Sequence, residues 1–197
     1  MPIAMSLTLG NLQIQPCRRP KIRPHAAAAN VPAQAEPLAL TSQDGVALAA
    51  MHLRHPSSST AIVVAHGFGG AHDQERVERI ASILSEDASV VAVTQRGHGA
   101  SEGMTTLGHR EPMDVEAAVA WARATGYDRV VTVGFSMGAA VVLRHAALLG
   151  PGSSDAVVAV SGEVDLIVAD AGRDRGEEGV GDRPFAEQKG PALSDPL

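Results

Sequence analysis

The stretch that decides the fold reads Val130-Val131-Thr132-Val133-Gly134-Phe135-Ser136-Met137-Gly138. Its apolar run is typical of a buried strand, and the next residues, 139–149, have the composition of a helix. A serine at a sharp turn from a strand into a helix is presented clear of the sheet edge, where its hydroxyl can act as a nucleophile. Glycine is needed on both sides because strand and helix pass too closely there for a Cβ atom. The stretch predicts a strand–turn–helix unit with Ser136 as a candidate nucleophile.

A second Gly-x-Ser-x-Gly match occurs at Gly99-Ala100-Ser101-Glu102-Gly103. No strand runs directly into this copy, because residues 95–98 intervene, and residues 104–108 show no helical period. The pattern needs its structural context to carry meaning. We therefore expect Ser101 to be a loop residue.

Bulk properties limit the classes of protein that this chain can represent. It has 197 residues, of which 45% are hydrophobic and 19% charged, as expected for one soluble globular domain. Only 3% are aromatic, so the core must consist mainly of Val, Ala, Leu and Ile. The net charge of -6 argues against nucleic acid as a partner. The single cysteine, Cys17, excludes an internal disulfide framework and a cysteine-based metal site.

The first 38 residues differ from the rest in composition. Prolines at positions 2, 16, 20, 24, 32 and 37 predict little regular structure there. No apolar run is long enough for a membrane span or a secretory signal. Residues 1–35 carry four basic side chains and no acidic one, which is compatible with an organelle transit peptide. The alternative is a disordered basic leader or a misassigned start codon, and on that interpretation we expect the protein to be cytoplasmic.

Residues 39–170 alternate between predicted strands and helices. Apolar runs predict strands at 46–53, 60–65, 89–94, 129–134 and 156–160, and amphipathic or capped segments predict helices at 73–87, 112–124 and 137–149. This alternation predicts the α/β class, with a doubly wound, mostly parallel sheet flanked by helices. Apart from the apolar run 164–168, residues 162–197 are rich in Gly and acidic side chains, and we expect 171–197 to be a disordered acidic tail.

A second glycine-rich turn, His66-Gly67-Phe68-Gly69-Gly70, follows the strand predicted at 60–65. Beside a nucleophilic serine, the backbone N–H groups of Phe68 and Met137 would form an oxyanion hole. The alternative is an ordinary Gly-rich turn. His66 is a rival for the general base, but we expect it to orient the loop by hydrogen bonding. The turn lacks the Gly-x-Gly-x-x-Gly spacing of a dinucleotide site, and no cofactor or metal is expected.

Three motifs in this order resemble the α/β-hydrolase superfamily over about residues 40–162. They are the turn at 66–70, the loop Arg96-Gly97-His98-Gly99-Ala100-Ser101-Glu102-Gly103, and the serine stretch at 134–138. The loop is similar to that of esterase, monoacylglycerol-lipase and acyl-peptidase branches, although Gln95 stands near a position where these branches often carry Asp. The resemblance implies a partial α/β-hydrolase fold that cleaves carboxylic ester, thioester or amide bonds of a small-molecule acyl substrate. His98 is expected to pack the loop.

The resemblance also implies an acid and then a histidine after the serine. The single histidine downstream, His145, lies nine residues along the predicted helix, about 13 Å from Ser136 along its axis, too far for a hydrogen bond. We expect it to be a surface or helix-packing residue. Among Asp155, Glu163, Asp165 and Asp170, the resemblance places the acid near Glu163 or Asp165, and Asp165 is the weak candidate retained.

The family's last strands and final helix have no counterpart in the pattern. The sheet edge beyond residues 156–160 is therefore predicted to be open, which would favour self-association or partner binding. Because the triad histidine is also missing, the chain is interpreted as the N-terminal part of a serine hydrolase with weak or no activity. The alternative is a non-catalytic binding or interaction protein on a truncated hydrolase fold.

Overall fold

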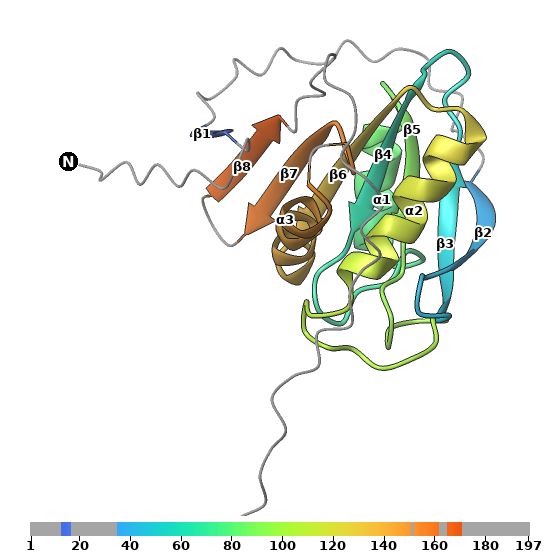
Figure 1. The fold of residues 1–197 in the computed structure, drawn as a ribbon. Helices are drawn as coiled ribbons and strands as arrows, with labels where there is room; N and C mark the ends of the chain where they lie inside the picture. The colour runs from blue at the N-terminus through green and yellow to red at the C-terminus, as the bar shows by residue number, and fades with distance from the viewer. Residues whose placement is uncertain (1–12, 17–34, 151, 162–164, 171–197) are drawn as a thin grey trace, which may run out of the picture.

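The computed structural model describes residues 13–16, 35–150, 152–161 and 165–170. The strands are β1 (Gln13–Pro16), β2 (Ala35–Thr41), β3 (Ala47–Leu53), β4 (Thr60–Ala65), β5 (Ser89–Val93), β6 (Arg129–Phe135), β7 (Ala156–Ser161) and β8 (Asp165–Asp170). The helices are α1 (Glu75–Leu84), α2 (Pro112–Thr125) and α3 (Met137–Leu149). The strands form one sheet in the order β1-β8-β7-β6-β4-β5-β3-β2 (Figure 1).

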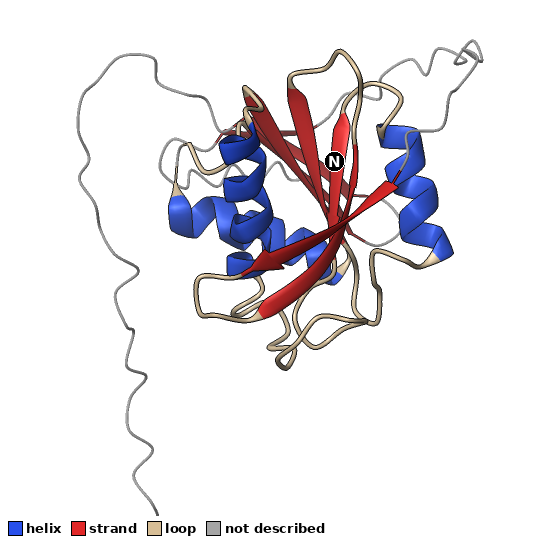
Figure 2. Cartoon of the chain, turned by 90° about the vertical axis from the view of Figure 1, so that its right-hand side faces the viewer, coloured by secondary structure: helices blue, strands red, loops and turns tan. Residues whose placement is uncertain are grey.

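The sheet lies between one helix and a pair of helices. α1 covers one face, and α2 and α3 cover the other (Figures 1 and 2). The core accordingly forms two clusters of buried residues. The cluster facing α2 and α3 includes Val63, Val91, Val119, Val130 and Val142, and the cluster facing α1 includes Met51, Val64, Val77, Ala81 and Val90. The predicted α/β class with a mostly parallel sheet is confirmed.

The central strands are parallel, and they bring three functional segments to one edge of the sheet. β5, β4, β6 and β7 are hydrogen-bonded neighbours that run in the same direction. Their near-continuous apolar sequence suits strands that are buried on both faces. Because the carboxyl ends of parallel strands meet at one edge, the loops after β4, β5 and β6 all emerge together there. These loops carry the three motifs identified in the sequence.

The helix boundaries follow ordinary capping signals. Pro112 occupies the first turn of α2, where a missing N–H costs nothing, and Gly126 ends that helix in the left-handed conformation with φ 102°. α1 spans Glu75–Leu84, which is shorter at both ends than the predicted 73–87. None of the helices in the described part of the chain is long and apolar enough to cross a membrane.

One sequence-based expectation about the sheet edges is wrong. The edge beyond β7 is not open, because β8 pairs with β7 in antiparallel register from Ser161↔Asp165 to Ala156↔Asp170. β1 in turn pairs with β8. Within the first 38 residues, the described regular structure consists of β1 and the start of β2. β8 follows β7 after residues 162–164, whereas β1 and β8 are far apart in the chain, and local composition does not report their pairing. The expected disorder of residues 171–197 lies outside the described residues.

Candidate active site

Ser136 occupies a strained backbone position between β6 and α3. Its φ of 51° and ψ of -114° fall in a region that L-residues rarely adopt. Within the described residues, Leu107 is the only other non-glycine residue with positive φ. The N–H of Ser136 donates a 2.8 Å hydrogen bond to the carbonyl of Val160 in β7, which anchors the turn, while its side chain is exposed. The turn therefore presents the hydroxyl to solvent at the carboxyl edge of the sheet.

The flanking glycines are required by close backbone contacts. A Cβ on Gly134 would collide with the carbonyl oxygen of Gly138, and a Cβ on Gly138 would collide with that of Ala65. A Cβ on Gly67 would lie 3.2 Å from the Cβ of Ser136 and 3.8 Å from its Oγ. The turn after β4 thus lies directly against the serine, as an oxyanion-hole arrangement requires.

The predicted oxyanion donors belong to segments that meet at this point. Phe68 follows Gly67 in the turn against the serine, and its ring is largely exposed. Met137 is the first residue of α3, where N–H groups have no acceptor inside the helix and where the helix dipole favours negative charge. The two amides remain predicted donors.

The hydrogen bonds of His66 occupy both of its ring nitrogens. Nε2 accepts the backbone N–H of Gln95 at 3.0 Å, so Nδ1 carries the ring proton and donates it to the carbonyl of Gly67 at 2.7 Å. Burial lowers the pKa of His66, which keeps the ring neutral. The ring could take a proton from Ser136 only by breaking its bond to Gln95. The geometry supports the expected role of His66 in orienting the loop.

Gln95 completes the joint between the loops after β4 and β5. Its side-chain Nε2 donates to the carbonyl of His66 at 2.6 Å, and the residue is fully buried. His98 lies beside this joint, with its ring 5.1 Å from that of His66 and 5.5 Å from that of Phe68. His98 Nδ1 also hydrogen-bonds the carbonyl of Arg96 at 3.0 Å. These contacts are those of the loop-packing residue expected at position 98.

Ser101 has the loop role that its sequence context indicates. Its Oγ donates to the carbonyl of Thr94 at 2.6 Å and accepts the N–H of Ala49 at 2.9 Å. The residue is buried, and its hydroxyl is committed to joining β3 to the loop after β5. The second Gly-x-Ser-x-Gly match is therefore structural.

His145 is a buried helix-packing residue. Its Nε2 lies 2.7 Å from Oε2 of Glu116, which joins α3 to α2. The ring is fully buried, so the surface alternative is wrong and the helix-packing alternative holds. Among the described residues, no hydrogen bond joins Ser136 to a histidine, and no cluster of His, Cys, Asp or Glu could hold a metal ion.

The acid candidates are only partly described. Asp155 accepts hydrogen bonds from Arg123 at 2.6 Å and from the N–H of Val130 at 2.7 Å, so it fixes the start of β7 against β6. Asp165 begins β8 opposite Ser161, which places its backbone at the same edge of the sheet as Ser136. Its side chain and the whole of Glu163 lie outside the described residues. The role of Asp165 stays a prediction.

Sequence reasoning missed a buried ion-pair network under the loop after β5. Asp114 accepts the backbone N–H of Arg96 at 2.8 Å and its guanidinium at 2.7 Å. The same guanidinium forms a two-pronged pair with Asp44 at 2.6 and 2.9 Å. The bond from Arg96 lowers the pKa of Asp44 to about 2. The network ties the β2–β3 turn and α2 to the functional loop, and spacing in the sequence carries no sign of it.

A second buried carboxylate, that of Glu111, organises the loop before α2. It accepts hydrogen bonds from Thr105, from Thr106 and from the N–H of Gly108, at 2.6–3.0 Å. Burial alone would raise the pKa of Glu111, but these bonds outweigh it and lower the pKa to about 2. The carboxylate is therefore ionised and holds residues 105–108 in one conformation.

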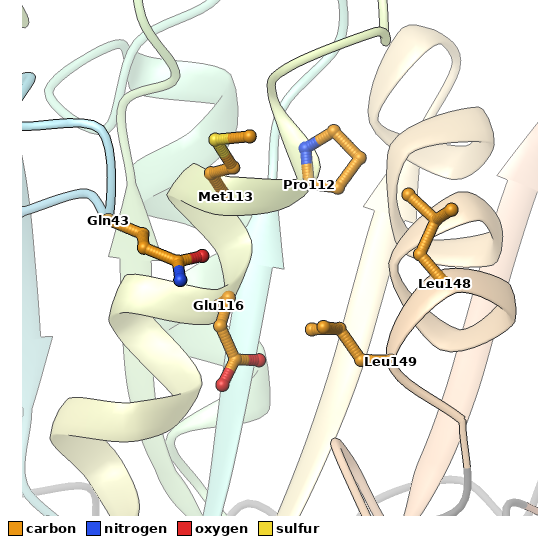
Figure 3. A pocket seen from close by; sticks show the side chains of 6 residues that line it. All are labelled: Gln43, Pro112, Met113, Glu116, Leu148 and Leu149. Atoms are coloured by element: carbon orange, nitrogen blue, oxygen red, sulfur yellow. The ribbon is translucent and has the colours of Figure 1, made fainter. Parts of the chain in front are cut away.

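A shallow hollow opens between α2 and α3, away from the serine turn. It is lined by Gln43, Pro112, Met113, Glu116, Leu148 and Leu149 (Figure 3). None of these residues belongs to the turns at 66–70 or 134–138. The hollow is therefore a feature of the helical face and not of the candidate site.

Comparison with known proteins identifies the family. A profile described as the alpha/beta hydrolase fold matches residues 60–188, more than half of the chain. Esterase Pf2001 of Pyrococcus furiosus is 28% identical, with a TM-score of 0.53 over 56% of this chain and 45% of that one. XC6422 of Xanthomonas campestris, described as an a/b serine hydrolase without lid, is 30% identical, with a TM-score of 0.55 over 64% of this chain and 60% of that one.

An alpha-beta serine hydrolase homologue from Coxiella burnetii is 25% identical, with a TM-score of 0.51 over 56% of each chain. The aligned region thus spans only 45% to 60% of these three proteins. A comparison with functionally curated sequences finds no match. The fold, the profile match over residues 60–188 and these neighbours agree that the chain belongs to the α/β-hydrolase fold family.

Proposed function

We propose that this protein is a serine hydrolase that cleaves carboxylic ester bonds, or the related thioester and amide bonds, through Ser136. The observation that carries the proposal is the strained, exposed backbone of Ser136 at the β6–α3 turn, with Gly67 packed against it. Strain of this kind persists only where the surrounding structure enforces it, and it concentrates at functional sites. The family match and the esterase and serine hydrolase neighbours agree with this chemistry.

The reaction would proceed through an acyl-enzyme. Oγ of Ser136 attacks the carbonyl carbon, its proton passes to a base, and the carbonyl oxygen becomes an oxyanion held by the N–H groups of Phe68 and Met137. The carbon–oxygen bond to the alcohol then breaks, and the alcohol leaves with a proton. Water hydrolyses the acyl-serine to release the carboxylic acid. Acylation and deacylation as written need no cofactor.

The rate of the first step depends on the base. No histidine within the described residues is hydrogen-bonded to Ser136, and His66 has both ring nitrogens occupied. The proton would therefore pass to water or hydroxide, which makes acylation slow. Oxyanion stabilisation and binding alone still give about 10³ to 10⁴ over water in a serine protease that has lost its triad. We accordingly propose weak turnover for the described domain.

Covalent labelling tests the proposal without requiring turnover. The full chain would be treated with a fluorophosphonate probe and analysed by intact mass and peptide mapping, and p-nitrophenyl acetate hydrolysis would be measured in parallel. Ser136→Ala should abolish labelling and reduce hydrolysis to the buffer rate, while Ser82→Ala, an exposed serine on α1, should behave as wild type. Labelling at another serine, or equal hydrolysis by wild type and Ser136→Ala, would reject the enzyme assignment.

The alternative of a non-catalytic interaction protein depended on an open sheet edge beyond β7. β8 pairs with that edge along its whole length. Within the described residues, no observation now favours the alternative over the hydrolase.

A further inference from the structure

Leu107 and Ser136 are the two non-glycine residues with a positive φ in the described part of the chain. The φ of Leu107 is 53°, in the left-handed region, where a leucine costs more than glycine or asparagine would. Its side chain is also 72% exposed, so burial of the leucine does not offset the strain. A large apolar side chain displayed at a strained position calls for a reason outside folding stability.

Leu107 is held in this position by the carboxylate of Glu111. The N–H groups on both sides of it, those of Thr106 and Gly108, donate to the two carboxylate oxygens at 2.6 and 2.8 Å. Both neighbours are hydrogen-bonded to one buried carboxylate. The backbone of Leu107 therefore cannot leave the left-handed region unless one of these charge-assisted hydrogen bonds breaks. The loop is therefore a rigid support for Leu107.

Successive contacts connect this support to the serine turn. Gly108 lies against Val141, with a hypothetical Cβ 3.9 Å from the valine methyl, and Val141 is one turn into the helix that begins directly after Ser136. At its other end, the loop packs Thr105 against Gly97. Gly97 precedes His98, whose ring touches that of Phe68, and Phe68 follows the glycine that contacts Ser136. These contacts therefore form a closed chain of neighbouring residues that includes Ser136.

The most exposed large apolar side chains belong to the loops in this chain of contacts. The three most exposed large hydrophobic residues in the described part of the chain are Met104 at 81%, Leu107 at 72% and Phe68 at 67%. All three come from the loops after β4 and β5, at the carboxyl edge of the sheet where Ser136 also lies. An apolar surface at a reactive hydroxyl is suited to an aliphatic chain, which would gain by leaving water there.

We propose that Leu107, together with Phe68, forms the contact surface for the acyl chain of the substrate, and that Ser136 acts on uncharged aliphatic acyl groups of medium length in preference to short ones. Leu107 is thus a specificity-determining residue. The inference rests on the proposed function, since it names the substrate class of the same site. Partial burial of four to six methylene groups of the acyl chain against this surface is enough for about a tenfold preference for the longer chain.

The test measures second-order labelling rates of the full chain with methyl and octyl fluorophosphonates. Ser136 Oγ forms a bond to phosphorus, fluoride leaves, and the hydroxyl proton passes to solvent. Wild type should react about ten times faster with the octyl reagent. Leu107→Asn, a residue that tolerates left-handed backbone, should bring the octyl-to-methyl ratio towards one while its thermal midpoint equals or exceeds that of wild type.

Ile83→Asn, an exposed apolar residue on α1, is the matched control and should keep the wild-type ratio. Equal rates of the two reagents on wild type, or a tenfold ratio that survives in Leu107→Asn, would overturn the inference and leave the proposed function standing. If Ser136 reacts with neither reagent, the proposed function fails and takes the inference with it. The two failures are therefore distinguishable.

Discussion

His66 and Gln95 form a two-way connection between the loops that follow β4 and β5. The N–H of Gln95 donates to Nε2 of His66 at 3.0 Å, and the Gln95 side chain donates to the carbonyl of His66 at 2.6 Å. Both residues are buried, so neither bond has a replacement from solvent. The connection fixes the turn that carries Phe68 against the loop that carries His98, and it requires an imidazole that is neutral.

The neutral state of His66 predicts a loss of stability in mild acid. Burial lowers the pKa of His66, whereas the unfolded chain titrates near 6.5. As the pH falls below 6.5, the unfolded state binds a proton that the folded state does not, so the free energy of unfolding decreases, by up to about 1.4 kcal/mol per pH unit. His66→Gln, which keeps an acceptor but does not titrate, should show a smaller decrease in urea denaturation between pH 6.5 and 5.

Burial also lowers the pKa of His52. The free energy of unfolding of His66→Gln should therefore still decrease to some extent as the pH falls. His109→Gln, an exposed histidine, serves as the control and should retain the wild-type slope. A slope in His66→Gln as steep as that of wild type would show that His66 is not held neutral.

The Arg96 network predicts unequal costs for two acidic substitutions. The side chain of Asp114 is fully buried and that of Asp44 is 26% exposed, although both bind the same guanidinium. Removing the fully buried partner leaves the guanidinium with only the partly exposed Asp44, so Asp114→Asn should lower the free energy of unfolding by about 3 kcal/mol, at the low end for a broken buried ion pair. Asp44→Asn should cost about 1 to 2 kcal/mol, since water replaces part of the lost interaction.

Acid denaturation offers an independent check on Asp44. Its pKa is lowered to about 2 by the bond from Arg96, against an ordinary value of 3.8. Its contribution is present above pH 3.8 and is lost as the pH falls towards 2, because the unfolded state takes up the proton first. The free energy of unfolding in Asp44→Asn should therefore fall less steeply between pH 4 and 2. If Asp114→Asn is more stable than Asp44→Asn, the ion-pair network of Arg96 is contradicted.

The glycine at 138 predicts a severe packing defect on substitution. A Cβ there would overlap the carbonyl oxygen of Ala65, and backbone cannot move aside as a flexible side chain can. Gly138→Ala should cost about 3 kcal/mol, at the upper end for overpacking, in urea denaturation. Gly126→Asn, at a left-handed helix end with open space around it, should cost less than about 1 kcal/mol. Similar costs for both would show that the β6–α3 turn is not close-packed against β4.

Local sequence pattern was sufficient for the three helices and for β3 to β7, but not for β1, β2 and β8 or for the long-range contacts. The turn at Ser136 and the loop role of Ser101 both follow from what precedes and follows each serine, because strand and helix periods are local properties. The pairing of β1 with β8 and the bonds of Arg96 to two distant acids join residues far apart in the chain. Glu111 also could not be recognised, since nothing in its spacing separates a buried anion from a solvated one.

Strain at Ser136 predicts that glycine is the better replacement for stability. Its φ of 51° and ψ of -114° form the mirror image of an extended conformation, which glycine adopts readily and alanine does not. Relief of about 1 to 3 kcal/mol of strain should outweigh the 0.5–1 kcal/mol entropic cost of glycine, so Ser136→Gly should be about 1 kcal/mol more stable than Ser136→Ala. At Ser82 in α1, the order must reverse, with glycine about 1 kcal/mol less stable than alanine. If alanine is the more stable residue at both positions, the backbone at 136 is relaxed and the main support for Ser136 as the nucleophile is lost.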